Sequence, residues 1–457
     1  MGVAVPALLV LIQSKRMSAG SQAAQGFAYN QVFSMPNTSL SKPATSHVRW
    51  VICALLFFAT VIAYVDRNVL SVLEKTLEGI LHFDSAQYGK MTGAFQFGYA
   101  ISMLVAGRLT DRLGTRKAFA LAIVFWSLAA MTPGAATSAA TLGIAMFLLG
   151  VGEAANFPAC NKTIAEWFPK RERALAIGLF NAGANLGSMT APLLVPGLVF
   201  WFGWRGAFVA AGSIGFVWLL FWLKIYAKPE QHRKVSAGEL ELILSDPVER
   251  IESVPWARLF PRRETWAFAL GKLLTDPVWW FWGFWLPRYL QGTYGLTMKE
   301  ASFPVTLAFA ASFIGSVGGG WIPSGMLNRG KSLNVSRKTA MLICAACVVP
   351  VMYAPYSKHL WVAVGLVGLA AAAHQGWSAN LFAMVSDMFP KAAVGSVTGI
   401  GGMVGAIGGA LTQVGVGYVV KWTNSYVPVF LTAGTAYLIA LAIIHALAPK
   451  LAPAKLD

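Results

Sequence analysis

Long apolar stretches alternate with short polar ones along most of this 457-residue chain. A helix of about 20 apolar residues is long enough to cross the hydrocarbon core of a bilayer. The pattern predicts an all-α polytopic membrane protein with twelve transmembrane helices in two six-helix halves. The helices are expected at residues 47–73, 88–107, 118–132, 142–163, 174–200, 204–226, 266–290, 303–322, 339–356, 359–384, 395–420 and 426–447.

The polar stretches set the expected domain limits. The predicted parts are a disordered cytoplasmic tail at 1–46, an N-terminal six-helix half at 47–226, a cytoplasmic linker at 227–264, a C-terminal six-helix half at 265–448 and a cytoplasmic tail at 449–457. The linker is the longest polar stretch between apolar segments. It is expected to carry a short amphipathic helix around residues 237–244.

Composition supports a membrane protein. The chain is 56% hydrophobic and only 12% charged, about half the charged share of a soluble domain. Its mean hydropathy is +0.58. The apolar runs are near 20 residues long and lack the alternation of ten-residue strands, which argues against a β-barrel.

The net charge of +17 does not indicate nucleic-acid binding. Most Lys and Arg residues lie in loops on one side of the predicted bundle and in the tails, which is the positive-inside bias and places both termini in the cytoplasm. We therefore expect the lipid bilayer as a partner and no nucleic acid. The four cysteines lie in apolar sequence and are interpreted as packing residues, so neither metal nor cofactor is expected.

The loop GRLTDRLGTRK, at 107–117, is the most specific string in the chain. Its spacing resembles the signature loop of the major facilitator superfamily, in which charges form a latch that opens and closes during transport. Gly114 permits a tight turn, and Asp111 is expected to follow the end of the second helix. The plainer alternative is a set of topology anchors. The latch residues that the resemblance implies are Gly107, Asp111, Arg112, Gly114, Arg116 and Lys117.

Four further strings narrow the resemblance. AYVDRNVLSVL on the first helix and LGVGEAANFPACNKTIAEWFPKRERA on the fourth resemble the anion:cation symporter family. WAFALGKLLTDPVWWFWGFWLPRYL and HQGWSANLFAMVSDMFPKAAVGSVTGIGGMVGAIGG look most similar to its bacterial hexuronate transporters. The resemblance implies a monomeric inner-membrane transporter, not an enzyme, that carries an organic anion with protons or sodium.

Asp66 and Arg67 lie side by side in the first predicted helix, where charge is costly and therefore suggests function. One interpretation is that they only neutralise each other. In the other, Arg67 shares a face with Tyr64 and holds a carboxylate through its guanidinium. The resemblance implies that Arg67 is the ligand of the substrate carboxylate, which leaves Asp66 as a proton site.

Glu153 is the acid of the fourth helix's apolar stretch, and no Lys or Arg lies within a helical turn of it in sequence. Burial of a lone carboxyl group favours its neutral form, which suits reversible protonation. The alternative is a permanently protonated structural residue. Family members often carry Arg two turns earlier, where this chain has Met146, so the proton route is left open.

Lys272 and Asp276 are four residues apart and share a face of the seventh helix. They are expected either to form an internal ion pair or to serve transport. In the second case Lys272 joins Arg67 around the anion from the opposite half, and Asp276 contributes to proton coupling. Pro277 would loosen the helix at this point.

Other polar and aromatic residues are candidates for contacts with the sugar ring and its hydroxyl groups, although packing explains each of them too. They are Tyr99, Asn185, His374, Gln375, Trp377 and Asn380.

The expected function is proton-coupled import of a hexuronate such as glucuronate or galacturonate by alternating access. The alternatives are another organic anion (aldonate, glucarate or an aromatic acid), sodium coupling, or a transporter-like sensor of sugar acids. No nucleotide-binding or hydrolase motif is present in the sequence.

Overall fold

The computed structural model describes residues 46–245 and 254–454, so nearly all of the predicted disordered tail lies outside the described residues. The helices of the first set are α2 (Val48–Leu81), α3 (Ser85–Leu113), α4 (Thr115–Met131), η1 (Thr132–Ala135), α5 (Ala139–Glu153), α6 (Asn156–Trp167) and α7 (Lys170–Ile225). Between the sets lie η2 (Pro229–Gln231), α8 (Ala237–Ile243) and α9 (Trp256–Leu259). The second set is α10 (Arg263–Tyr294), α11 (Met298–Asn328), α12 (Leu333–Val348), η3 (Val349–Tyr356), α13 (Leu360–Met388), α14 (Lys391–Thr423) and α15 (Val427–Leu447).

Among the described residues, nine helical segments are long and apolar enough to cross a membrane. One of them is α7, whose 56 residues would extend about 84 Å if straight, more than two bilayer cores. It turns at Gly203, where φ is 67°, and so supplies two spans. The helices α3 and α10, with 29 and 32 residues, are as long as the other spans but more polar. Together these give the predicted twelve spans.

The predicted helix ends need correction. α2 continues two turns past residue 73, through a polar segment that was expected to leave the helix. α3 runs to Leu113, so Asp111 and Arg112 lie in its last turn and do not follow it. The fourth predicted span is interrupted by Ala154 and Ala155, which separate α5 from α6. Polar residues extend α2 because Glu74 and Glu78 form ion pairs with Arg288 of α10.

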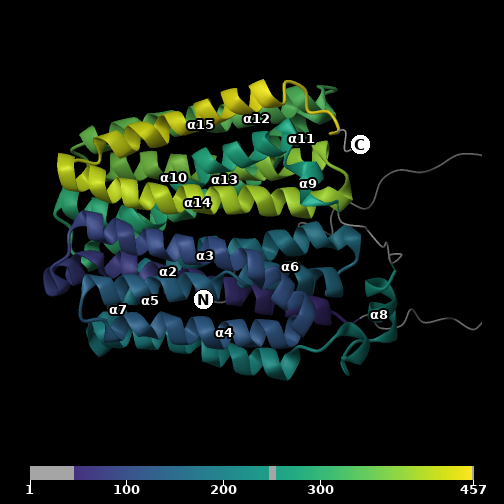
Figure 1. The fold of residues 1–457 in the computed structure, drawn as a ribbon, viewed down its shortest axis with the longest axis horizontal. Coiled ribbons are helices and arrows are strands. Elements are labelled where there is room, and N and C mark those ends of the chain that lie inside the picture. The colour runs from purple at the N-terminus through teal and green to yellow at the C-terminus, as the bar shows by residue number, and fades with distance from the viewer. Residues whose placement is uncertain (1–45, 246–253, 455–457) are drawn as a thin grey trace, which may run out of the picture. The chain divides into compact units, whose positions relative to one another are not determined.

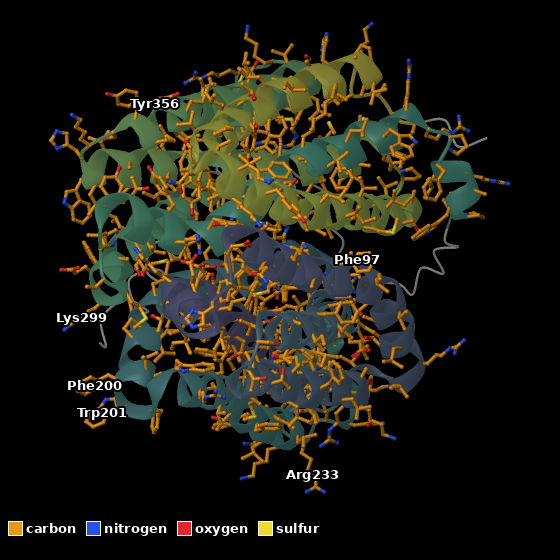
Figure 2. All side chains as sticks on the ribbon, turned by 60° about the vertical axis from the view of Figure 1, so that its left-hand side comes forward. Phe97, Phe200, Trp201, Arg233, Lys299 and Tyr356 are labelled. Atoms are coloured by element: carbon orange, nitrogen blue, oxygen red, sulfur yellow. The ribbon has the colours of Figure 1, made fainter. Side chains whose placement is uncertain are left out.

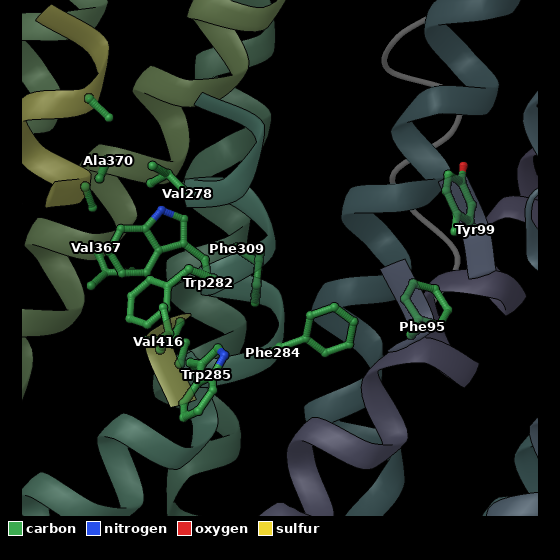
Figure 3. Close-up of a cluster of buried hydrophobic side chains, with 14 of the residues drawn as sticks. Phe95, Tyr99, Val278, Trp282, Phe284, Trp285, Phe309, Val367, Ala370 and Val416 are labelled. Atoms are coloured by element: carbon green, nitrogen blue, oxygen red, sulfur yellow. The ribbon is translucent and has the colours of Figure 1, made fainter. Parts of the chain in front are cut away.

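Each set of helices packs mainly on itself (Figure 1). In the first set α2 packs on α7 and α3 on α5, and in the second set α11 packs on α13 and α10 on α14. Contacts between the sets run mainly along three helix pairs, α3 with α14, α7 with α11, and α2 with α10. We call these contacts the seam. Figure 3 shows Phe284 of α10 pointing across it toward Phe95 of α3, with ring centroids 5.7 Å apart.

Large apolar side chains cover the outside of both sets. Phe200 and Trp201, next to the turn in α7, are 81% and 77% exposed, and Figure 2 shows them projecting from the edge of the molecule. Exposed aromatic rings at helix ends are typical of membrane interfaces. The chain is therefore a multi-pass membrane protein whose outer surface is suited to lipid.

The seam is tightest where α3 begins and α14 ends. A Cβ atom at Gly89 would lie 2.5 Å from the carbonyl oxygen of Gln413 and 3.0 Å from the Cα of Gly417, so the two backbones touch. Toward the other ends of these helices, a Cβ at Gly107 or Gly399 would meet no atom within 4 Å. We call the first region the closed end of the seam.

Charged groups also join the sets at the closed end. Arg288 of α10 forms ion pairs with Glu74 and Glu78 of α2, and its Nη2 donates to Ser85 Oγ at 2.8 Å. We call these four residues the charged strap. Asp84 and Lys421 form a second ion pair across the seam at 2.8 Å. Glu74 is fully buried, so its pairing with Arg288 explains why α2 extends beyond the predicted end.

The predicted linker helix is present as α8 and is anchored to the start of α2. The Glu239 carboxylate accepts hydrogen bonds from Ser46 Oγ at 2.5 Å and from the backbone N–H groups of Val48 and Arg49 at 3.1 Å. It also pairs with Arg49 Nη1 at 3.0 Å. Burial by itself raises the pKa of Glu239, but these hydrogen bonds outweigh it and hold the pKa below its usual value.

Candidate functional site

Arg67 and Glu153 form a buried ion pair between α2 and α5. The Glu153 Oε2 atom accepts from Arg67 Nη2 at 2.6 Å and from Nε at 3.0 Å. The two residues are 4% and 0% exposed. Arg67 Nη1 and Glu153 Oε1 have no hydrogen-bond partner among the described residues. Glu153, which has no Lys or Arg within a helical turn in sequence, therefore pairs with Arg67, 86 positions away. Each of the two side chains still has one polar atom free to bind another group.

Aromatic rings surround the Arg67 guanidinium. Its Cζ lies 4.4 Å from the ring centroid of Tyr64, 4.8 Å from that of Phe95 and 5.4 Å from that of Tyr99. A fourth ring, Trp280 of α10, lies 4.8 Å away. We call these four rings the aromatic cage. Ring faces stabilise a cation that has left water, and they also offer an apolar surface to a sugar ring.

Asp66 is not the partner of Arg67 in this structure. It is 3% exposed, and neither of its carboxylate oxygens has a hydrogen-bond partner among the described residues. Asp66 and Arg67 therefore do not neutralise each other as a pair of sequence neighbours in this structure. A buried carboxyl group without an ion-pair partner inside a membrane helix is costly, which makes Asp66 a candidate for function.

Lys272 and Asp276 form the expected pair on one face of α10, with Nζ 2.7 Å from Oδ2. The ammonium lies 4.7 Å from the ring centroid of Phe382, and a Cβ atom at Gly405 of α14 would clash with Asp276 Oδ2. Lys272 is 7% exposed. No described contact brings it to Arg67, so the two cations occupy separate places in this conformation.

Two candidate sugar ligands, Asn185 and Gln375, bind each other between the two sets of helices. Asn185 Oδ1 of α7 accepts from Gln375 Nε2 of α13 at 3.2 Å and from Ser312 Oγ of α11 at 3.1 Å. Ser312 was not among the residues predicted for the site. These bonds join the two sets directly, so a sugar that bound here would have to replace them.

The other candidates of α13 are packed more deeply. The Nδ1 atom of His374 lies 2.6 Å from Tyr437 Oη, and its ring stacks on Trp279 with centroids 5.0 Å apart. Trp377 is fully buried, and Asn380 Nδ2 donates to the carbonyl oxygens of its neighbours Gly319 and Gly376. His374 contacts the site through Trp279, which also lines the cavity next to Arg67.

A narrow cavity lies between the aromatic cage and the second set. Its volume is about 10 Å³, enough for about one water molecule. Its lining residues are Tyr64, Arg67, Asn68, Ser188, Trp279, Trp280, Gly283, Phe284 and Phe309. Most of these were missed in the sequence, where an aromatic residue in a membrane helix cannot be distinguished from a packing residue. The tryptophan pair two residues after Pro277, Trp279 and Trp280, was the available signal.

The signature loop is tied to the first set. Gly114 has a φ of 75° and forms the predicted tight turn between α3 and α4. Arg116 Nη2 donates to the carbonyl oxygen of Leu223, whereas Lys117 and Arg112 are exposed. The side chain of Asp111 lies outside the described residues. A Cβ atom at Gly107 would meet no atom within 4 Å. No described contact joins the loop to the second set, so its role as a latch stays a prediction.

Comparison with known proteins identifies the architecture. Residues 56–413 match the family model described as Major Facilitator Superfamily. The chain is 29% identical to the hexuronate transporter of Escherichia coli strain K12, over 84% of this chain and 90% of that protein. It is 32% identical to the galacturonate transporter of Dickeya chrysanthemi, over 66% of this chain and 89% of that protein.

A solved structure gives the same fold. The chain is similar to the crystal structure of a D-xylose-proton symporter with a TM-score of 0.71 and 13% identity, over 89% of this chain and 99% of that one. The predicted all-α, two-half membrane fold is thereby confirmed.

Proposed function

Because the chain belongs to the major facilitator superfamily, we propose that it is a secondary active transporter that imports a hexuronate, such as glucuronate or galacturonate, together with protons. The names of its relatives support an acidic sugar as substrate. The observation that carries the proposal is the buried Arg67–Glu153 pair within the aromatic cage. It offers one cation to two competing carboxylates, one from the protein and one from the substrate.

The orientation follows from the charge bias. With the basic loops and both termini in the cytoplasm of a bacterial inner membrane, the closed end of the seam faces outward. The described conformation is then an inward-facing one. Its Arg67–Glu153 pair corresponds to the state after the substrate has left.

Exchange of carboxylates at Arg67 couples the proton to the sugar acid. Protonation of Glu153 removes the negative charge that holds the guanidinium, and the substrate carboxylate replaces it by a bidentate pair. When Glu153 loses its proton toward the cytoplasm, it pairs with Arg67 again and expels the anion. The charge of the guanidinium is thereby compensated in every step, which avoids the large cost of a buried unpaired cation.

Asp66 supplies a second proton site in this proposal. A monovalent anion that moves inward against the membrane potential is opposed by about 2.3 kcal/mol per 100 mV, and one accompanying proton cancels that opposition. A second proton, carried by the unpaired Asp66 carboxyl group, makes import electrogenic and driven by the potential. Asp66 and Glu153 are thus proposed as the two coupling groups.

Lys272 and the polar residues of the seam complete the site. Closure of the cytoplasmic side would bring Lys272 toward Arg67. Asp276 would then either accept a proton or, when it is not protonated, hold Lys272 in an ion pair. The amides of Asn185 and Gln375 exchange their mutual bond for sugar hydroxyl groups, and His374 orients Trp279 against the ring. We assign Trp377 and Asn380 supporting positions behind this surface.

Movement of the two halves, proposed at 47–226 and 265–448, exposes the site alternately to the two sides of the membrane. The linker at 227–264 joins them, and the signature loop 107–117 acts as the cytoplasmic latch in a monomeric carrier.

The proposal is tested by uptake of labelled glucuronate into proteoliposomes with an imposed inward proton gradient. Accumulation that collapses with a protonophore supports symport. Binding without accumulation would indicate a sensor, and accumulation that requires sodium alone would contradict proton coupling. A panel of unlabelled aldonates, glucarate and aromatic acids in competition identifies the preferred anion.

A further inference from the structure

Gln96 of α3 is a buried side chain whose hydrogen-bonding groups are unused. It is 0% exposed, and neither its Oε1 nor its Nε2 has a partner among the described residues. A buried amide without partners is destabilising, so its retention needs a reason. The transport cycle described above does not use it.

The position of Gln96 connects it with the Arg67 site. Phe95 and Tyr99, its neighbours on α3, both contribute rings to the aromatic cage. Figure 3 shows these two rings. Across the seam, a Cβ atom at Gly409 of α14 would lie 3.6 Å from Gln96 Cδ and 3.6 Å from Trp280 Nε1. The amide therefore faces the same glycine as the cage tryptophan, at the inner limit of the closed end.

Its neighbours on the same stripe of α3 are bonded. Gly89, Thr92 and Gln96 recur at three- and four-residue intervals and face α14. Thr92 Oγ1 bonds the carbonyl oxygen of Tyr88 at 3.2 Å and lies 3.3 Å from Gln413 Oε1. Gln413 Oε1 also accepts from Trp285 Nε1 at 2.7 Å. One helical turn closer to the cage, Gln96 has a donor and an acceptor that no described residue uses.

We infer that Gln96 is a specificity-determining residue that binds a ring hydroxyl group of the sugar acid whose carboxylate is held by Arg67. A hydroxyl group both donates and accepts, which matches the two free groups of the amide. A carboxylate with no hydroxyl groups would leave Gln96 unpaired and would be disfavoured for that reason. The inference rests on the proposed function, because it assumes a sugar-acid substrate.

The test combines Gln96→Met, which keeps length but removes hydrogen bonding, with glucuronate and its monodeoxy analogues in proteoliposome uptake. We expect the variant to raise the KM for glucuronate about tenfold. One deoxy analogue should show the same KM in wild type and variant, because it already lacks the bonded hydroxyl group. Thr92→Val, one turn away on the same stripe, should leave every KM unchanged.

Several outcomes would overturn the inference. An unchanged KM for glucuronate in Gln96→Met would do so. An equal rise of the KM for every deoxy analogue and for cyclohexanecarboxylate would also do so, because it would indicate that Gln96 serves packing alone. If Gln96→Met fails to reach the membrane, Gln96→Asn is put through the same comparison with the same criterion. Wild-type vesicles that accumulate no glucuronate contradict the proposed function itself, whereas normal wild-type uptake with no analogue-specific effect contradicts only the role of Gln96.

Discussion

Arg67 and Lys272, the two buried cations of the candidate site, are paired in different ways. Arg67 joins two helices, since its carboxylate partner Glu153 lies on α5, and its cage includes a ring from the opposite set. Lys272 is paired with Asp276 four residues further along the same helix. A pair between helices can be broken by helix movement or by a competing anion, whereas a pair within one helix persists through rigid-body motion. We therefore place carboxylate exchange at Arg67 and a supporting field at Lys272.

The largest expected effect is that of Arg67→Lys. An ammonium keeps the charge but loses the planar, bidentate geometry, and hydrogen bonds to charged groups contribute about 1.5–3 kcal/mol each. We expect the initial rate of glucuronate uptake to fall about 100-fold. Arg205→Lys, at a guanidinium stacked on Trp204 away from the seam, should transport normally. Unchanged uptake and affinity in Arg67→Lys would remove the distinction between the two cations.

Glu153→Gln should separate substrate movement from its driving force. The amide mimics the protonated acid, so Arg67 stays available to the substrate while the proton can no longer be released. We expect gradient-driven accumulation to fall to about a tenth, while exchange of internal for external glucuronate persists. Uptake assayed with and without a pH gradient measures both. Full accumulation in this variant would assign the coupling proton to another group, with Asp66 first among them.

The Lys272–Asp276 pair should give a smaller and reversible effect. Lys272→Met leaves the half-buried Asp276 without its ion-pair partner, and we expect it to lower stability and raise the KM by about tenfold. The double variant with Asp276→Asn restores neutrality. If it regains stability but keeps the higher KM, Lys272 contacts the anion. If both recover, the pair serves structure alone, and the contrast with Arg67 becomes complete.

The charged strap extends the comparison to a pair that crosses the seam. Arg288→Gln breaks the ion pairs with Glu74 and Glu78 that hold the closed end. We expect a lower melting temperature in detergent and a greater outward-facing population, with uptake changed by no more than about threefold. Cross-linking of a cysteine pair introduced at Ser85 and Lys421 measures closure. Undiminished cross-linking in the variant would show that glycine packing alone closes this end.

The sequence predicted the helical architecture, and it singled out the charged residues inside the helices as candidates. Asp66, Arg67 and Glu153 are conspicuous because charge is rare in apolar helices, and Tyr64 lies one turn from Arg67. The pairing of Arg67 with Glu153 could not be predicted from the sequence, because it depends on how α2 and α5 pack and the two residues are 86 positions apart.

Aromatic residues and helix ends were the weaker predictions. Phe95 and Trp280 resemble packing residues in sequence, and only their position over the guanidinium marks them. The end of α2 was placed too early because Glu74 is charged, and its ion pair with Arg288 on a distant helix keeps it buried within the helix. In both cases the missing information is tertiary contact, which local composition does not contain.

The most direct test of the account is the proton balance of substrate binding. Glucuronate is added to the detergent-solubilised protein in weakly buffered solution near neutral pH, and the protons taken up are counted for wild type and Glu153→Gln. If the substrate carboxylate displaces Glu153 from Arg67, wild type takes up more protons per bound glucuronate than the variant does. Equal uptake by the two proteins would contradict carboxylate exchange at Arg67.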